Sequence, residues 1–196
     1  MEDKMKIIKF SISGIIKVGD GRGFIVERGA FRFILTAAHC LPHLPPCHLM
    51  SHLEEITYRD LAGHLDGDGA VWVECIFADP VQDIAVLGTP DYQELFEQAD
   101  LYKKLTGAVM PVQIREAVAG ETAWVLDLGG EFKSFVLEGN NRRRLWGKIT
   151  EGIMKPGMSG SPIFGDDGLA ISLCNIGGPS PDSPLINLEK CLPGWF

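Results

Sequence analysis

Short apolar runs alternate with turns rich in glycine, aspartate and proline along most of the chain. The stretch GFIVERGAFRFILTAAHC predicts a hairpin, with strands at residues 24–27 and 31–36 around a turn at 28–29. A further strand is predicted at 70–77, followed by an Asp-Pro turn and a buried apolar run at 84–87. This pattern is typical of an all-β protein.

The second half of the chain repeats the pattern. The segments ETAWVLDL, KSFVLEG and RLWGKITEG predict strands, and SPIFGDDGLAISLCNIG predicts a hairpin around residues 166–168. Between the two β-rich parts, DYQELFEQADLYKKLTG predicts two or three helical turns, with apolar residues spaced along one stripe: Leu95, Phe96, Leu101 and Leu105. The expected organisation is a β domain at 1–92, a partly helical linker at 93–106 and a second β domain at 107–196.

Composition narrows the possible partners. The 196 residues have a formal net charge of -8, which disfavours nucleic acid, whose backbone requires clustered Lys and Arg. No stretch approaches the roughly 18 apolar residues of a membrane span, and lysines interrupt the apolar N-terminal segment, so neither a membrane association nor a signal peptide is expected. The five cysteines form no CxxC pair, which favours a reduced, cytoplasmic protein.

The stretch KPGMSGSPIFGDDG places two hydroxyls, Ser159 and Ser161, in one tight turn. Either this is a plain hairpin connection, or one serine is presented for chemistry. A serine hydroxyl becomes a good nucleophile when a histidine accepts its proton and a carboxylate orients that histidine. All five histidines precede residue 65, so only the order His, Asp, Ser is open to Ser159.

Candidates for the other two residues follow from local context. His39 ends an apolar strand in FILTAAHC, where a packed core could fix its ring, although a histidine there could equally be structural. Asp83 directly precedes a run that must be buried, which would shield its carboxylate for an imidazole N–H. Asp79, before Pro80, is the alternative acid, but it suits a turn better.

The glycines around Ser159 suit a site for a developing negative charge. Gly157 can adopt backbone angles that aim its N–H at the same point as the N–H of Ser159. Two such donors would form an oxyanion hole. Gly160 would let the chain turn away without a side chain in the path of a substrate.

Three motifs in order, LTAAHC, QDIAVL and GMSGSP, resemble those of the trypsin/chymotrypsin-like serine peptidases. They are most similar to the compact bacterial type, which includes glutamyl endopeptidases and the high-temperature-requirement proteases. The resemblance implies two perpendicular six-stranded antiparallel β-barrels, with the active site in the cleft between them and no cofactor. It also implies that Ser159 is the nucleophile, His39 the general base and Asp83 the orienting acid. Ser161 would then be structural.

The chain departs from secreted animal members at two positions. The cysteine after the catalytic histidine is Cys40, and Phe24 stands near the position of its usual disulfide partner. Met158 replaces the aspartate with which a newly cleaved N-terminus pairs. The site is therefore expected to form without N-terminal processing, or to be ordered by a regulatory protein partner.

The same resemblance implies a substrate pocket. Ile153 and Met154 would lie near the base of the pocket for the residue before the scissile bond. Its wall would be formed by NIGG, that is Asn175, Ile176, Gly177 and Gly178. This wall would pair with an extended peptide as an added strand. Glutamyl endopeptidases have histidine in place of Asn175, so an uncharged, small or medium side chain is expected in the pocket.

The loop HCLPHLPPCHLMSHL contains four histidines and two cysteines, which suggests a metal site. Its prolines break the helical spacing that would align such ligands, so a surface loop without metal is predicted instead.

Together these patterns predict a serine endopeptidase that acts on proteins or peptides. The alternative is a catalytically silent or partner-activated binding module with a protease shape. An esterase is a third possibility, because the same acyl chemistry cleaves esters, but a groove for an extended strand favours peptides.

Overall fold

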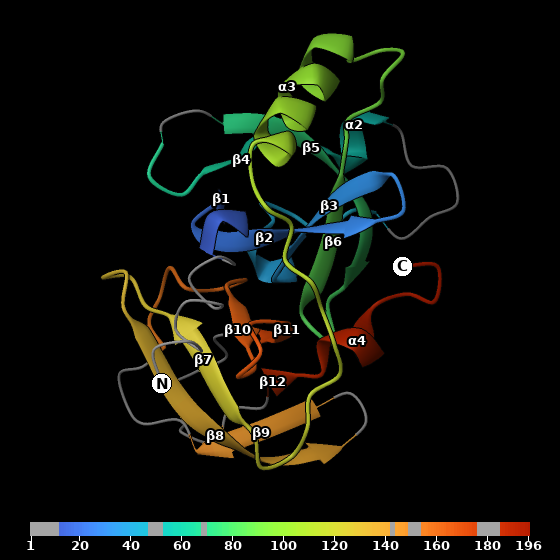
Figure 1. The fold of residues 1–196 in the computed structure, drawn as a ribbon. Helices are drawn as coiled ribbons and strands as arrows, with labels where there is room; N and C mark the ends of the chain where they lie inside the picture. Colours follow the sequence, from blue (N-terminus) through green and yellow to red (C-terminus); the bar gives the residue numbers. More distant parts are fainter. Residues whose placement is uncertain (1–11, 47–52, 68–69, 142–143, 149–153, 176–184) are drawn as a thin grey trace.

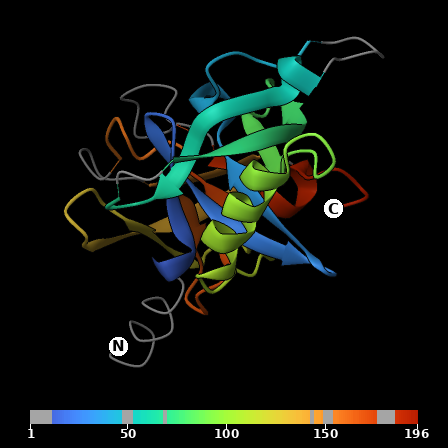
Figure 2. The same ribbon diagram turned by 90° about the horizontal axis from the view of Figure 1, so that it is seen from above.

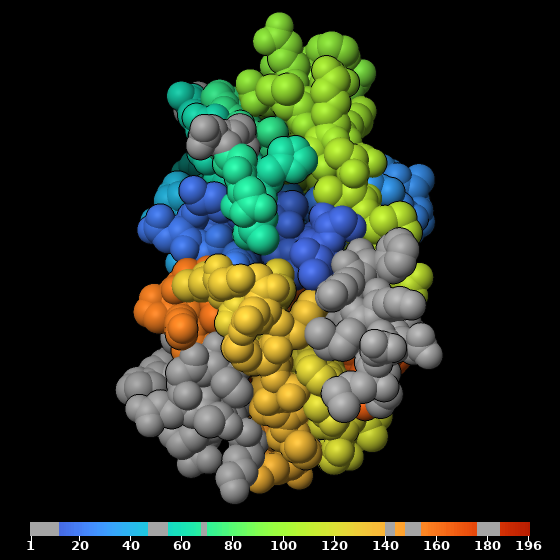
Figure 3. Space-filling view, turned by 60° about the vertical axis from the view of Figure 1, so that its left-hand side comes forward, coloured from blue at the N-terminus to red at the C-terminus, as the bar shows by residue number. Residues whose placement is uncertain are grey.

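The chain folds into two β-rich halves, one above the other in Figure 1. The computed structural model describes residues 12–46, 53–67, 70–141, 144–148, 154–175 and 185–196. In the space-filling view the two halves meet along a continuous seam, with blue and teal above orange and yellow (Figure 3).

The first half is a closed antiparallel barrel, in the strand order β1-β2-β3-β6-β5-β4. Its strands are β1 (Ile15–Val18), β2 (Gly21–Arg28), β3 (Phe31–Thr36), β4 (Thr57–His64), β5 (Ala70–Asp79) and β6 (Ile84–Gly88). Three short helices accompany them: η1 (Ile12–Gly14), η2 (Ala38–Cys40) and α2 (Leu53–Ile56).

The second half is a six-stranded antiparallel sheet, in the order β11-β10-β7-β8-β9-β12, whose edge strands β11 and β12 lie close together (Figure 1). Its strands are β7 (Thr122–Leu126), β8 (Phe132–Asn141), β9 (Arg144–Lys148), β10 (Pro162–Phe164), β11 (Ala170–Leu173) and β12 (Leu185–Ile186). The short helix α4 (Leu188–Cys191) follows β12. The prediction of two six-stranded antiparallel barrels is confirmed, with one barrel closed and one nearly closed.

The predicted β2–β3 hairpin forms as expected, with Phe24 opposite Leu35 and Ile25 opposite Ile34. Alternate residues of these strands point in opposite directions, and both faces are buried. Ile25 and Ile34 lie inside the closed barrel, whereas Phe24 and Leu35 pack against the second half of the chain. Strands buried on both faces need apolar residues at every position, which explains the continuous runs FIV, FIL and IAVL.

The linker contains the helix α3 (Phe96–Gly107), which crosses the outside of the closed barrel in Figures 1 and 2. The predicted apolar stripe is only partly correct. Phe96 and Leu101 are exposed, and the buried face is instead made by Ala99, Tyr102, Leu105 and Thr106. The hydroxyl of Tyr102 donates to the carbonyl oxygen of Arg32 at 2.9 Å, which attaches the helix to β3. Within the described ranges, no helix is long and apolar enough to span a membrane.

The sequence pattern missed three strands. β1 and β12 have only four and two residues. In β4 the pairing with β5 shifts register between Tyr58 and Ala62, and Asp60 has a φ of 51°. This irregularity breaks the alternation of apolar and polar residues by which a strand is detected.

Gly160 lies at a close contact between the two halves. Its φ is +79°, and a Cβ atom there would lie 2.0 Å from the carbonyl oxygen of Arg22 and 2.6 Å from Oγ1 of Thr36. We expected this glycine to clear the way for a substrate. The structure gives a different reason, because the missing side chain makes room for the backbone of the first barrel.

We expect Gly160→Ala to lower the free energy of unfolding by about 3 kcal/mol or more, because it combines a strained φ with overpacking. Gly130→Ala is the matched control, since Gly130 has a similar φ of +81° but no atom within 4 Å of the added Cβ. The control should lose only about 1 kcal/mol. Urea denaturation measures both values, and equal losses would show that the contact with Arg22 is unimportant.

Candidate active site

Two neighbouring strands of the first barrel bring His39 and Asp83 together. His39 lies in η2, just after β3, and Asp83 directly precedes β6, which pairs with β3. Nδ1 of His39 lies 2.7 Å from Oδ2 of Asp83, and the backbone N–H of His39 donates to Oδ1 at 2.9 Å. One carboxylate therefore holds both the ring and the backbone of His39.

Asp83 has an uncommon backbone conformation, with a φ of 55°. Aspartate tolerates this left-handed region better than most residues, but the conformation still has a cost, which the surrounding contacts must offset. The preceding turn is fixed by Oδ1 of Asp79, which accepts the N–H groups of Val81 and Gln82 at 2.9 and 3.0 Å. Asp79 is thus the turn residue that the sequence suggested.

Asn175 is a second partner of Asp83, which sequence reasoning missed. Its amide Nδ2 donates to Oδ2 of Asp83 at 3.1 Å and to the backbone carbonyl of Asp83 at 2.9 Å. It follows β11 in the second half, so a residue of one half orients the acid of the other. We expected Asn175 only in the wall of a substrate pocket, and the sequence motif gave no sign of this contact.

The pair has shifted pKa values. The hydrogen bond that the His39 ring donates to Asp83 raises the pKa of His39 above 6.5, against the opposing effect of burial. For Asp83 the largest single effect is burial, which would raise its pKa, but the hydrogen bonds from His39 and Asn175 together lower it below 3.8. Asp83 is therefore ionised at neutral pH, and His39 is a stronger base than an unperturbed histidine side chain.

The loop before Ser159 forms a tight turn. Met158 N–H donates to the carbonyl of Lys155 at 3.1 Å, and Gly157 has a φ of +90°. A proline at the second position and a glycine with positive φ at the third are the features of a type II turn. The prolyl-glycyl sequence thus fixes the orientation of the peptide between Pro156 and Gly157.

The N–H groups of residues 157–161 divide into two sets. Those of Met158, Gly160 and Ser161 donate to backbone carbonyls. Among the hydrogen bonds of the described residues, the N–H groups of Gly157 and Ser159 donate none. These are the two groups that the sequence predicted for an oxyanion hole, and both remain available to a ligand.

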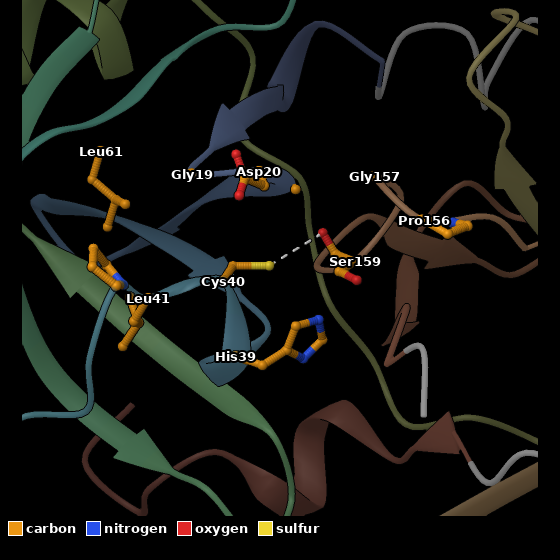
Figure 4. A pocket seen from close by; sticks show the side chains of 11 residues that line it. Gly19, Asp20, His39, Cys40, Leu41, Leu61, Pro156, Gly157 and Ser159 are labelled. Carbon is orange, nitrogen blue, oxygen red and sulfur yellow. Dashed lines mark hydrogen bonds between the residues drawn. The ribbon is translucent and has the colours of Figure 1, made fainter. Parts of the chain in front are cut away.

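Ser159 is 8% exposed, and its carbonyl oxygen accepts the N–H of Arg22 at 2.7 Å. Its side chain and the ring of His39 line the same pocket, as Figure 4 shows. In the described part of the chain no hydrogen bond joins the two side chains. In structures without substrate such catalytic hydrogen bonds are often long, so their absence does not disqualify the pair.

The pocket has a volume of about 560 Å³. Its lining comes from both halves: Gly19, Asp20, Gly21, His39, Cys40, Leu41, Pro42, Leu61, Pro156, Gly157 and Ser159. Three glycines and three residues after His39 make up much of the wall.

The remaining predicted residues are only partly placed. Ile153, Ile176, Gly177 and Gly178 lie outside the described residues. Met154 packs against the core of the second half and does not line the pocket. Ser161 is fully buried, and its hydroxyl has no hydrogen-bond partner among the described residues.

The cysteines and histidines that the structure describes form no metal site. The four described cysteines, Cys40, Cys75, Cys174 and Cys191, are free thiols. No group of three or more potential ligands occurs within the described ranges, and residues 47–52 of the histidine-rich loop lie outside them.

Comparison with known proteins identifies a similar fold among solved structures but no similar sequence. No family model and no curated protein sequence matches the chain. Among solved structures, the inactive form of the Rv3671c protease is similar, with a TM-score of 0.58, 14% identity and coverage of 94% of this chain and 88% of that chain. The serine endoprotease from Yersinia pestis is similar with a TM-score of 0.57 and 14% identity.

The fold is that of the chymotrypsin-like serine proteases. The match with the Yersinia pestis protein covers 94% of this chain but 61% of that one. In this chain the pocket lies where the two halves meet, and both His39 and Ser159 contribute to its lining.

The imidazole of His39 should titrate with a pKa above 6.5, and Asp83→Asn should lower that pKa, because it removes the charge that stabilises the protonated ring. Two-dimensional NMR of the histidine side chains across pH measures both. Glu94→Gln, which removes a carboxylate outside the pocket, is the control. An unchanged titration in Asp83→Asn would contradict the assigned hydrogen bond.

Proposed function

We propose that the chain is a serine endopeptidase that hydrolyses peptide bonds through an acyl-enzyme on Ser159. The principal support is the His39–Asp83 pair, in which Nδ1 of His39 lies 2.7 Å from Oδ2 of Asp83, together with the pocket that His39 and Ser159 both line. The fold similarity to serine proteases supports the same conclusion.

In the proposed reaction, Oγ of Ser159 attacks the peptide carbonyl carbon, and its proton passes to Nε2 of His39. The negative charge of Asp83 stabilises the resulting imidazolium. The C–N bond then breaks, and His39 returns the proton to the leaving amine. A water molecule attacks the acyl-enzyme by the same route in reverse and releases the carboxylic acid and Ser159.

The N–H groups of Gly157 and Ser159 would bind the oxygen that becomes negatively charged during each attack. A single donor of this kind contributes about 2.7–4 kcal/mol to the transition state in other enzymes. The type II turn fixes one of these groups before substrate arrives, so little reorganisation is needed.

The second candidate is a protease-shaped binding module, silent by itself or activated by a regulatory protein. The missing hydrogen bond between His39 and Ser159 favours it. In such a protein the pocket would bind a peptide, but Ser159 would remain unreactive until a partner brought the two side chains together.

We further propose that the protein acts in the cytoplasm, where its four described thiols would remain reduced. The preference for an uncharged side chain before the scissile bond remains a prediction, as does the lack of nucleic-acid and membrane partners.

A fluorophosphonate probe should label the wild-type protein covalently, because it reacts with an activated serine. Ser159→Ala should abolish the labelling. Ser161→Ala is the matched control and should leave it intact, because the Ser161 hydroxyl is buried without a partner among the described residues. Intact-mass spectrometry measures the adduct. A folded wild-type protein that takes up no probe would support the binding module instead.

Asn175→Ala should lower the rate of labelling or peptide hydrolysis about tenfold, since it removes hydrogen bonds to an ionised carboxylate. It should also lower the pH at which activity falls on the acidic side, because a less well ordered Asp83 raises the pKa of His39 less. Rate–pH profiles of both proteins test this. If the acidic limbs of the two profiles have the same midpoint pH, Asn175 does not influence the pKa of His39, and its role is purely structural.

A further inference from the structure

The pocket beside Ser159 is lined for much of its extent by residues of the first barrel. This inference rests on the proposed peptidase function. The sequence predicted six residues that would bind the acyl side of the substrate, and the structure describes two of them, Met154 and Asn175. Neither of these two lines the pocket. Asn175 instead contacts Asp83, whereas the pocket extends from Ser159 to Pro42 and Leu61 of the first barrel. A peptide whose carbonyl sits at Ser159 would therefore place its amine side here.

The pocket walls suit a long side chain with a polar end. Leu41, Pro42, Leu61 and Pro156 provide apolar surface, and Asp20 is the one carboxylate among the described residues that line the pocket. None of these described lining residues is a lysine or an arginine. In Figure 4 Asp20 lies opposite His39, with Cys40 between them.

Asp20 is held in place by the backbone around it. Gly19 N–H donates to the carbonyl of Leu61 at 2.8 Å, and Arg22 N–H donates to the carbonyl of Ser159 at 2.7 Å. The turn between β1 and β2 is therefore attached to both halves of the chain. Asp20 itself is exposed and forms no ion pair in the described part of the structure, so its charge is available to a ligand.

We propose that this pocket binds a lysine or arginine side chain from one of the first two residues after the scissile bond, with Asp20 as the specificity-determining residue. The aliphatic stem of such a side chain would lie against the apolar walls while its charged end reaches Asp20. The net charge of -8 would also attract a basic peptide.

Cleavage of a peptide library, with the products sequenced by mass spectrometry, tests the proposal. The wild-type protein should prefer lysine or arginine over glutamine at one of these two positions by up to about fivefold, the upper limit for an exposed ion pair. The preference should weaken at high salt. Asp20→Asn should remove it, whereas Glu94→Gln, with the same change of charge outside the pocket, should keep it.

Binding to the Ser159→Ala variant separates this proposal from the proposed function. Calorimetry would compare lysine- and glutamine-containing peptides in Ser159→Ala, with and without Asp20→Asn. If the wild-type protein cleaves nothing but Ser159→Ala prefers the lysine peptide through Asp20, the peptidase function fails and the pocket assignment holds. Cleavage without a basic preference, or a preference unchanged in Asp20→Asn, overturns the pocket assignment alone. Neither cleavage nor selective binding overturns both.

Discussion

The contact between Arg22 and the Ser159 loop is the constraint on which the candidate site depends. The N–H of Arg22 donates to Ser159, and its carbonyl accepts the hydroxyl of Thr36 at 2.7 Å. Its guanidinium donates to the carbonyls of Leu126 and Asp127 in the second half. Burial lowers the pKa of this guanidinium, and unpairing a buried charge is costly. One residue thus fixes the Ser159 loop of one half against the barrel of the other.

The acid–base pair shows the same dependence between halves. His39 and Asp83 both belong to the first barrel, but the amide that completes the hydrogen bonding of Asp83 comes from Asn175 in the second. Asp83 also has a left-handed backbone, a conformation that persists only where neighbouring contacts determine it. Separation of the halves would remove the partner of the acid and the support of the serine together.

The pocket follows from how the halves meet. Glycines occupy the positions of closest approach, and the short turn between β1 and β2 reaches the Ser159 loop. Cys40 is a free thiol, and its sulfur lies beside this turn, 3.7 Å from the carbonyl oxygen of Ser159. A basic side chain bound at Asp20, as proposed above, would lie in the same region where the two halves meet.

The sequence by itself determined the fold class, the β2–β3 hairpin, the buried run after Asp83 and the loop glycines, because these depend on local patterns of apolar residues and turns. It also selected His39 and Asp83, through motif order. Only the tertiary structure decided the contacts of Arg22 and Asn175, the place of Asp20 in the pocket and the true buried face of α3. These depend on contacts between residues as far apart as Asp83 and Asn175, and no local pattern encodes which distant backbone a side chain will meet.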